Sequence, residues 1–406
     1  MAFDRRLVVI TGAGGNLGRA LATALGRDYR IVGLDLVASD KAFPILAADM
    51  SDAGSLKQAL DRIAKDHGTR IASVIHLAAY FDFTGEEDPR YEAVNVNGTR
   101  NLLNALQALD VEQFLYTSTM LVHAPVRPGE AIDETQPIGP GWAYPKSKAR
   151  AEAAIAEAHG RIPYVILRLA GVYDERTTIP TMAQQMARIY EGDLQSHLYS
   201  GSTLTGQSML HREDMIDAIK RAVDRRASLE SGTAILIGEP HAMSYDAIQD
   251  ELGHALHGAE EWLTLRVTKR LAAIGAKAME VMEKVVPDVI DRGEKPFVKP
   301  FMVRMADDHY ALDIKRAVDL LGWRPHHRLK EELPRMQPPS KRIQSAGIAP
   351  IGSRHRRSLP RPPRAASTPK SCAWRTWRAH ARSTANRGGR TSSTWRSALC
   401  SSPSPR

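Results

Sequence analysis

Short apolar runs alternate with amphipathic stretches along the first 170 residues. Runs rich in Val, Ile and Leu predict buried strands at residues 6–10, 30–34, 44–48, 73–77, 114–116 and 164–167. Between them, the spacing of apolar positions predicts helices at about residues 17–25, 53–66, 89–109 and 142–159. Continuous apolar strands separated by helices indicate a parallel sheet that is buried on both faces. We therefore expect an α/β fold with a doubly wound parallel sheet of the Rossmann type.

After Gly171 the alternation is less regular. The pattern predicts helices at about residues 178–191, 260–286 and 313–321, and one more strand at residues 233–237. The apolar face of the helix at 260–286 suits either a membrane surface or a packed lid, and we expect a packed lid. We expect a nucleotide-binding core at residues 1–170. A smaller C-terminal substrate lobe is expected at residues 171–336, with some elements that return to the core.

Charge is distributed unevenly along the chain. The whole sequence has 55 Lys and Arg against 46 Asp and Glu, which gives a net charge of +9. The last 70 residues hold 15 of the basic side chains and no acidic ones, so residues 1–336 carry 40 basic and 46 acidic side chains, a net charge of −6. The chain therefore combines an acidic globular part with a basic tail, and the overall charge does not indicate an anionic partner.

The tail at residues 337–406 lacks apolar periodicity and is rich in Arg, Ser and Pro, so we expect it to be disordered. Three interpretations of it stay open. It is a solvated extension, or an arm for nucleic acid or anionic membranes with interleaved Arg and Trp, or the product of a shifted reading frame in a GC-rich gene. We expect no specific nucleic-acid partner.

Several classes of protein are excluded by composition. No run of about 18 apolar residues is present, so no membrane span is expected. Residues 1–336 contain no cysteine, because Cys372 and Cys400 both lie in the tail. A disulfide scaffold and thiolate metal sites are therefore excluded from the globular part, we expect no metal, and a reducing, cytoplasmic location is indicated.

A glycine-rich segment, Thr11-Gly-Ala-Gly-Gly-Asn-Leu-Gly18, lies where the first strand meets the first helix. Gly12 allows a tight turn, Gly15 lets backbone N–H groups approach a pyrophosphate, and Gly18 lets the helix pack on the strand. The helix N-terminus adds partial positive charge. In this context the segment predicts a dinucleotide site, and the alternative is an ordinary glycine-rich turn.

Two acidic residues follow the next strands. Asp35 ends the second strand, where its carboxylate can accept hydrogen bonds from both adenosine ribose hydroxyls and would repel a 2′-phosphate. Asp35 therefore favours NAD over NADP, unless it is a solvated strand end. Asp49 follows the third strand and can accept from the adenine amino group while Met50 packs on the ring, or it can cap a helix.

Tyr144 and Lys148 are four residues apart at the start of a predicted helix, so they lie on one helical face. Free tyrosine has a pKa of about 10 and is a poor base at neutral pH. We expect the ammonium of Lys148 to lower the pKa of Tyr144 and make it a usable acid and base. Thr119 follows the fifth strand, where its hydroxyl can hold a substrate oxygen.

With these motifs the chain resembles the extended branch of the short-chain dehydrogenase/reductase superfamily, the NAD-dependent epimerase/dehydratase family. The resemblance covers residues 6 to about 336. Its motifs are the glycine segment, His76-Leu-Ala-Ala79, Asn95-Val-Asn-Gly-Thr99, Thr117-Ser-Thr119, Tyr144-x-x-x-Lys148, Arg168-Leu-Ala-Gly-Val-Tyr173 and Leu321-Gly-Trp-Arg-Pro325.

The resemblance implies NAD as cofactor and a catalytic group of Thr119, Tyr144 and Lys148, with Asn95 positioning the lysine through the backbone or a water. It also implies a small-molecule substrate, and we expect a homodimer. The implied cofactor-binding residues are Gly12, Gly15, Asn16, Leu17, Gly18, Asp35, Asp49, Met50, Leu77, Ala78, Ala79, Asn95, Thr117, Tyr144 and Lys148.

The reaction and the substrate stay open at this point. The family's 4,6-dehydratases carry an Asp-Glu pair after the catalytic Thr, whereas Met120 and Leu121 follow Thr119 here, which disfavours dehydration. Its nucleotide-sugar epimerases carry a diphosphate-binding Arg at the position of Gln207. Arg304 either supplies a second such Arg or is solvated. An alcohol of the 3β-hydroxysteroid type or a dihydroflavonol-type ketone suits this pattern, so we predict a dehydrogenase or reductase, with an epimerase and a non-enzymatic dinucleotide sensor as alternatives.

Overall fold

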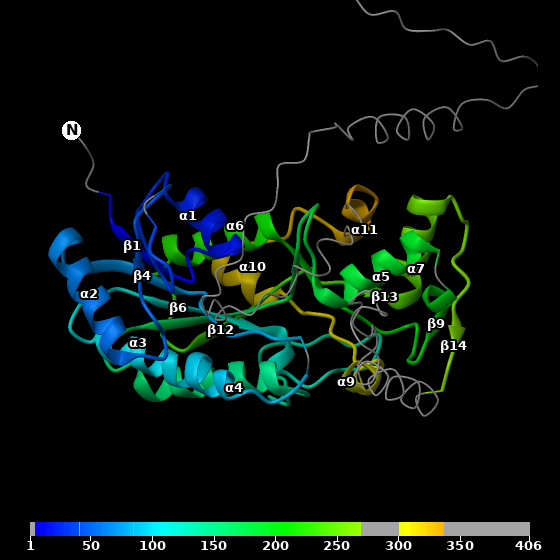
Figure 1. Cartoon of the computed structure of the whole chain (residues 1–406), viewed down its shortest axis with the longest axis horizontal. Helices are drawn as coiled ribbons and strands as arrows, with labels where there is room; N and C mark the ends of the chain where they lie inside the picture. Colours follow the sequence, from blue (N-terminus) through cyan, green and yellow to red (C-terminus); the bar gives the residue numbers. More distant parts are fainter. Residues whose placement is uncertain (1–4, 40, 84, 193, 269–299, 337–406) are drawn as a thin grey trace, which may run out of the picture. The chain divides into compact units, whose positions relative to one another are not determined.

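The computed structural model describes residues 5–39, 41–83, 85–192, 194–268 and 300–336 (Figure 1). The tail predicted at residues 337–406 and most of the helix predicted at 260–286 lie outside the described residues.

An all-parallel sheet, with the helices on its two faces, forms the part of the structure that we call the first lobe. Its order is β12-β7-β6-β4-β1-β2-β3, with β5 paired to β4. The bounds are β1 (Leu7–Thr11), β2 (Arg30–Asp35), β3 (Ile45–Ala47), β4 (Arg70–His76), β5 (Asp110–Val111), β6 (Phe114–Thr119), β7 (Tyr164–Leu169) and β12 (Thr233–Ile237). The chain leaves β1 toward β2 on one side and later toward β4 on the other. This switch point is where open α/β sheets bind ligands.

Helices cover both faces of the sheet, as the apolar strands predict (Figure 1). One face packs on α1 (Asn16–Leu25), α6 (Arg212–Asp224) and α10 (Lys315–Leu321). The other packs on α2 (Ala53–His67), α3 (Gly98–Leu106) and α4 (Ala143–Ala158). In β1, Val8 and Ile10 enter the first core and Leu7 and Val9 the second, so the strand is buried on both sides. The prediction of a doubly wound fold is confirmed.

The helix predicted at 89–109 begins with a π-helical turn, η1 (Tyr91–Asn97), before α3. Such turns are rare and often lie at functional sites. A short 3₁₀ turn, η2 (Met120–Val122), follows β6.

We call the remaining short strands and helices the second lobe. Paired strands are β8 (Gly171–Tyr173) with β11 (Met209–His211), β9 (Leu198–Tyr199) with β14 (Leu265–Arg266), and β10 (Gly206–Gln207) with β13 (Met243–Ser244). The helices are α5 (Pro180–Glu191), η3 (Leu194–His197), α7 (Tyr245–His257), α9 (Pro300–Arg304), α11 (Leu329–Glu332) and η4 (Leu333–Arg335). A core that includes Met182, Ile189, Leu252 and Leu333 joins α5, α7 and η4. The boundary predicted at residue 170 falls between β7 and β8.

One predicted helix is wrong over its described part. Residues 260–268 contain no helix, and Leu265 instead pairs with Leu198 across β14 and β9. The Trp262 backbone N–H donates to the Asp250 carboxylate at 2.8 Å. The apolar positions Leu263 and Leu265 are exposed, so their spacing does not reflect a buried helical face.

Candidate active site

A cavity of about 1560 Å³ lies at the carboxyl edge of the sheet and extends to residues of the second lobe. Its lining includes all of the predicted catalytic and cofactor-binding residues except Asn95. The strands bring these residues together because β1, β2, β3, β4 and β6 are parallel and end at the same edge.

The glycine segment forms a tight turn into α1. Gly12 has a φ of +70°, which favours glycine, and a Cβ there would lie 3.0 Å from the Ala78 nitrogen. A Cβ on Gly18 would lie 2.3 Å from the Gly12 carbonyl oxygen, closer than real contacts allow. The turn is thus a backbone cradle at a helix N-terminus, which fits a pyrophosphate.

Asp35 and Asp49 both face the cavity. The Asp35 carboxylate accepts hydrogen bonds from the Gly14 N–H at 2.8 Å and the Leu36 N–H at 2.8 Å, so the glycine turn fixes its position. The Asp49 carboxylate accepts from the Ser51 N–H, while Asp52 caps α2. Because Asp52 is the cap, Asp49 is available to the cavity.

A buried hydrogen-bond chain supports the segment Leu77 to Ala79. The Ala78 N–H donates to the Thr11 hydroxyl, which donates to His76 Nδ1 at 2.6 Å. His76 Nε2 contacts the Thr99 hydroxyl at 3.0 Å, and that hydroxyl donates to the Asn95 carbonyl. His76 therefore carries a proton on Nε2. Burial, together with the Lys148 ammonium, lowers the pKa of His76 to about 3, so the ring is neutral and Nδ1 accepts from Thr11.

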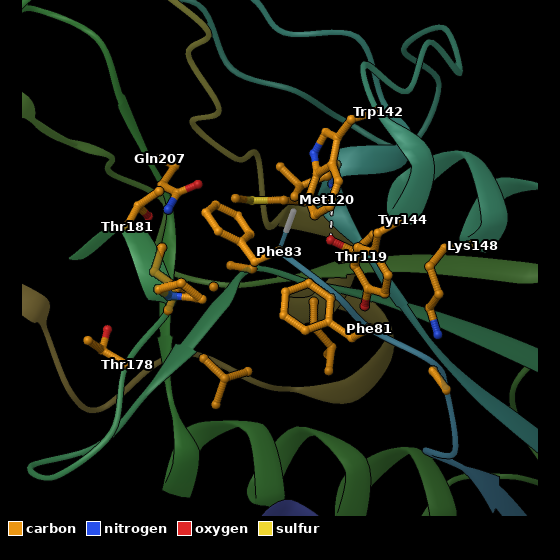
Figure 2. A pocket seen from close by; sticks show the side chains of 18 of the residues that line it. Phe81, Phe83, Thr119, Met120, Trp142, Tyr144, Lys148, Thr178, Thr181 and Gln207 are labelled. Carbon is orange, nitrogen blue, oxygen red and sulfur yellow. Dashed lines mark hydrogen bonds between the residues drawn. The ribbon is translucent and has the colours of Figure 1, made fainter. Parts of the chain in front are cut away.

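Thr119, Tyr144 and Lys148 line one wall of the cavity (Figure 2). Thr119 ends β6 and its hydroxyl oxygen accepts from the Leu121 N–H at 3.3 Å, which leaves its proton free to be donated. Tyr144 and Lys148 lie in the first turns of α4. The Lys148 Nζ lies 4.2 Å from the centroid of the Tyr116 ring, in a cation–π contact.

The expected effect of Lys148 on the pKa of Tyr144 is not found. Burial raises the pKa of the Tyr144 hydroxyl, and Tyr91 raises it further. Burial also lowers the pKa of Lys148 to about 7, although the Glu152 carboxylate acts in the opposite direction. The prediction was wrong because both groups are buried, and burial disfavours the phenolate and the ammonium alike.

Asn95 lies beneath the cavity wall and is 1% exposed. Its side-chain oxygen accepts the Tyr80 N–H at 2.6 Å, and its nitrogen donates to the Tyr80 carbonyl and to the Ser147 hydroxyl at 2.8 Å. The Ser147 hydroxyl donates to the Tyr144 carbonyl. Asn95 thus joins the segment after β4 to the helix that carries Tyr144, and it reaches Lys148 only through that helix.

A buried ion pair behind α4 was not anticipated from the sequence. The Glu152 carboxylate accepts from Arg168 at 2.7–3.3 Å and from the Ser118 hydroxyl at 2.5 Å. Arg168 also donates to His123 Nε2 at 3.0 Å. The only sequence signal is that Glu152 lies one helical turn after Lys148.

Aromatic side chains in the cavity lining pack against Tyr144. The Phe81 ring meets the Tyr144 ring at 82° with centroids 4.7 Å apart, and Trp142 lies 5.6 Å from Tyr144. Phe83 and Phe301 contact Trp142 at 5.6 and 5.7 Å. Figure 2 shows Gln207 and Thr181 across the open space from Tyr144. Arg304 is exposed and is not part of the lining, so it corresponds to the solvated alternative.

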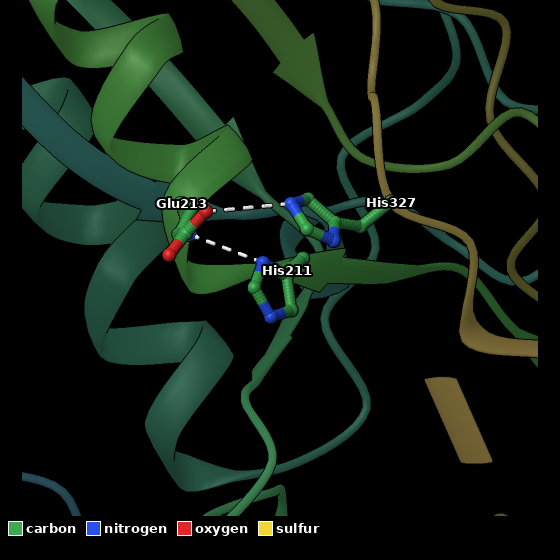
Figure 3. A group of neighbouring side chains, drawn as sticks. All are labelled: His211, Glu213 and His327. Carbon is green, nitrogen blue, oxygen red and sulfur yellow. Dashed lines mark hydrogen bonds and ion pairs between the residues drawn. The ribbon is translucent and has the colours of Figure 1, made fainter. Parts of the chain in front are cut away.

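His211, Glu213 and His327 form a second cluster, with possible ligand atoms within 4.8 Å of one another (Figure 3). The two imidazole rings stack 3.9 Å apart at 27°, so their in-plane lone pairs do not converge on one ion. His211 Nδ1 accepts from the Glu213 N–H and caps α6, and Asp214 accepts from the His327 N–H at 2.9 Å. We assign the cluster to capping and packing.

Comparisons with known proteins place this geometry in context. The model of the NAD dependent epimerase/dehydratase family matches residues 8–238. The chain is 25% identical over 353 residues to 3 beta-hydroxysteroid dehydrogenase type 7 of Mus musculus, covering 78% of this chain and 90% of that protein. It is 26% identical over 269 residues to dTDP-D-glucose 4,6-dehydratase of Mus musculus, covering 62% and 73%.

Solved structures share the fold. The structure of UDP-glucuronic acid 4-epimerase from Bacillus cereus, determined with UDP-glucuronic acid and NAD, superposes with a TM-score of 0.58 at 21% identity and covers 80% of this chain and 96% of that one. None of the helices in the described residues combines the length and apolar character needed to cross a bilayer.

Proposed function

Because this chain belongs to the NAD-dependent epimerase/dehydratase family, we propose that it is an NAD-dependent oxidoreductase that interconverts a secondary alcohol and its ketone. The observation that carries the proposal is the placement of Thr119, Tyr144 and Lys148 in one wall of a cavity that also includes the glycine cradle. Proton transfer and dinucleotide binding then take place in one continuous space.

The residues of the first lobe fit NAD. The cradle of Gly12 to Gly18 would hold the pyrophosphate, Asp35 the adenosine ribose, and Asp49 with Met50 the adenine. Lys148 would hold the nicotinamide ribose. When bound, the nicotinamide supplies a site that accepts or releases a hydride.

Tyr144 is the proposed proton-transfer group. During alcohol oxidation its oxygen takes the proton of the substrate hydroxyl, and during ketone reduction it returns that proton. The Thr119 hydroxyl donates a hydrogen bond to the same substrate oxygen. Lys148 is assigned to the nicotinamide ribose and not to the pKa of Tyr144, because burial raises that pKa and Lys148 does not offset the rise. Asn95 positions this group from beneath through Ser147.

The lining of the cavity supports an apolar substrate. Besides the aromatic side chains, it includes Met120, Leu121, Ile179 and Met302. Met120 and Leu121 cannot transfer protons, so an elimination that needs a second acid and base has no group at this position. Gln207 is neutral and can exchange hydrogen bonds with an uncharged group of the substrate.

A nucleotide-sugar epimerase is the second candidate, and Arg188 favours it. Arg188 lies in the cavity wall contributed by α5, next to Tyr245, and gives the second lobe a cationic side chain that suits a diphosphate. The purified protein, incubated with NAD⁺ and either secondary alcohols or nucleotide sugars, separates the two. Net NADH supports the oxidoreductase, and an isomerised sugar without net NADH supports the epimerase. Binding of NAD⁺ with turnover of neither class would favour a dinucleotide sensor.

A further inference from the structure

Phe301 and Gly85 meet at the wall of the substrate chamber. Gly85 has a φ of +76°, and Phe301 Cγ lies 2.4 Å from the position that a Cβ on Gly85 would occupy. Real Cβ atoms do not approach other atoms below 3.0 Å. The Phe301 ring can therefore occupy its place only because residue 85 has no side chain.

The ring of Phe301 is one end of a continuous series of aromatic contacts. Phe301 meets Phe83 at 72° with centroids 5.3 Å apart, and both contact Trp142. Trp142 and Phe81 in turn contact Tyr144. We call Phe81, Phe83, Trp142 and Phe301 the aromatic wall. It joins segments of three different regions of the chain, and all four residues line the cavity.

The chemistry of the wall selects among substrates. An apolar fused-ring system can pack on these side chains and remove its surface from water. A sugar ring offers less apolar surface to them, so the wall favours the hydrocarbon rings. The wall starts at Tyr144 and ends at Phe301, so an extended fused-ring alcohol held at Tyr144 can reach Phe301, whereas a small ring at Tyr144 does not depend on that contact.

We propose that Phe301, seated on Gly85, is a specificity-determining residue that completes the aromatic wall and selects an extended, apolar fused-ring alcohol or ketone whose reacting carbon lies beside Tyr144. The assignment rests on the proposed oxidoreductase function for its reaction, but the selection itself is a property of binding.

The test uses the full chain loaded with NAD⁺ and two alcohols, the tetracyclic 3β-alcohol dehydroepiandrosterone and the small alcohol cyclohexanol. Dissociation constants come from calorimetry, and KM and kcat from NADH formation. Gly85→Ala displaces Phe301 and is expected to raise the Kd and KM for the tetracyclic alcohol about tenfold, the loss of roughly one aromatic contact. The kcat, the Kd for NAD⁺ and the KM for cyclohexanol should stay within about twofold.

Three further variants separate displacement of Phe301 from general strain. Gly129 has a φ of +94°, and no atom lies within 4 Å of the position of a Cβ on it. Gly129→Ala therefore introduces the same kind of backbone strain without a clash, and it should leave the Kd and the KM for the tetracyclic alcohol unchanged. Phe301→Ala should weaken binding of the tetracyclic alcohol by about as much as Gly85→Ala does. Adding Gly85→Ala to Phe301→Ala should then cost nothing more, because the clashing ring is gone.

The proposal would be overturned if Gly85→Ala and Gly129→Ala changed the Kd for the tetracyclic alcohol equally. It would also be overturned if the effects of Gly85→Ala and Phe301→Ala on that Kd were additive. Wild-type protein that binds dehydroepiandrosterone no more tightly than cyclohexanol would also overturn it. If the oxidoreductase function fails, no alcohol yields NADH, yet the calorimetric comparison of the variants still decides the role of Phe301.

Discussion

Replacing Glu152 with Gln removes the negative charge of a buried ion pair while preserving the shape of the side chain. The Glu152 and Arg168 side chains are 10% and 9% exposed, and three N–O contacts of 2.7–3.3 Å join them. The variant leaves the Arg168 guanidinium buried without a counter-charge, which costs about 3–5 kcal/mol in such pairs. We expect a loss of about 3 kcal/mol in the free energy of unfolding, at the lower end because the Gln oxygen and His123 still accept hydrogen bonds.

Urea unfolding of a double-mutant cycle measures this interaction. Arg168→Met should destabilise the protein by a similar amount, because it leaves the Glu152 carboxylate buried. The double variant Glu152→Gln/Arg168→Met should lose about 3 kcal/mol less than the sum of the two single losses, since neither charge is then left unpaired. Additive losses would refute the reasoning, because they would mean that the two side chains do not interact.

The single variant Glu152→Gln also tests the effect of Glu152 on the pKa of Lys148. The Glu152 carboxylate opposes the effect of burial on Lys148, so Glu152→Gln should lower the pKa of that ammonium below about 7. Activity that needs the charged lysine is lost as the pH rises through the pKa of Lys148. In Glu152→Gln this loss should therefore begin at a lower pH than in the wild type. Ser118→Ala keeps the charge and serves as the control, since its pH profile should not move.

Three further predictions concern the cofactor site and the buried core. Gly18→Ala places a methyl group 2.3 Å from the Gly12 carbonyl oxygen and should weaken NAD⁺ binding in calorimetry by more than about tenfold, whereas Gly129→Ala should not. Asp35→Ser removes the charge that repels a 2′-phosphate, so the ratio of NADP⁺ to NAD⁺ affinity should rise, and an unchanged ratio would contradict the placement of the ribose. His76 has a pKa of about 3 in the folded state against about 6.5 when unfolded, so below pH 6.5 only the unfolded chain takes up this proton. The free energy of unfolding should fall by about 1.4 kcal/mol more per pH unit below 6.5 in the wild type than in His76→Asn, and equal slopes would rule out a neutral, buried His76.

Elements with local signals could be predicted from the sequence. The strands of the sheet are short apolar runs buried on both faces, and the glycine segment lies at one junction of a strand and a helix. The predicted residues then meet at the cavity because parallel strands end at a common edge. Asp35 is a case in point, since its position at the end of β2 alone brings it to the glycine turn.

Features that depend on contacts between distant segments could not be predicted. The aromatic wall combines Phe81 and Phe83 with Trp142 and Phe301, and no spacing in the sequence relates them. The helix predicted at 260–286 fails over residues 260–268 because pairing with β9 outweighs local periodicity. The direction of the shift in the Tyr144 pKa was also predicted wrongly, because the shift depends on burial, which a spacing of four residues does not reveal.

The most direct test of the central claim is NADH formation by wild-type protein and by Tyr144→Phe, with NAD⁺ and the best secondary alcohol, alongside calorimetric binding of NAD⁺ to both. Removal of one hydroxyl should abolish NADH formation and leave the Kd for NAD⁺ within about twofold, because the cradle and Asp35 are unchanged. NADH formation at the wild-type rate by Tyr144→Phe would contradict the assignment of Tyr144 as the proton-transfer group.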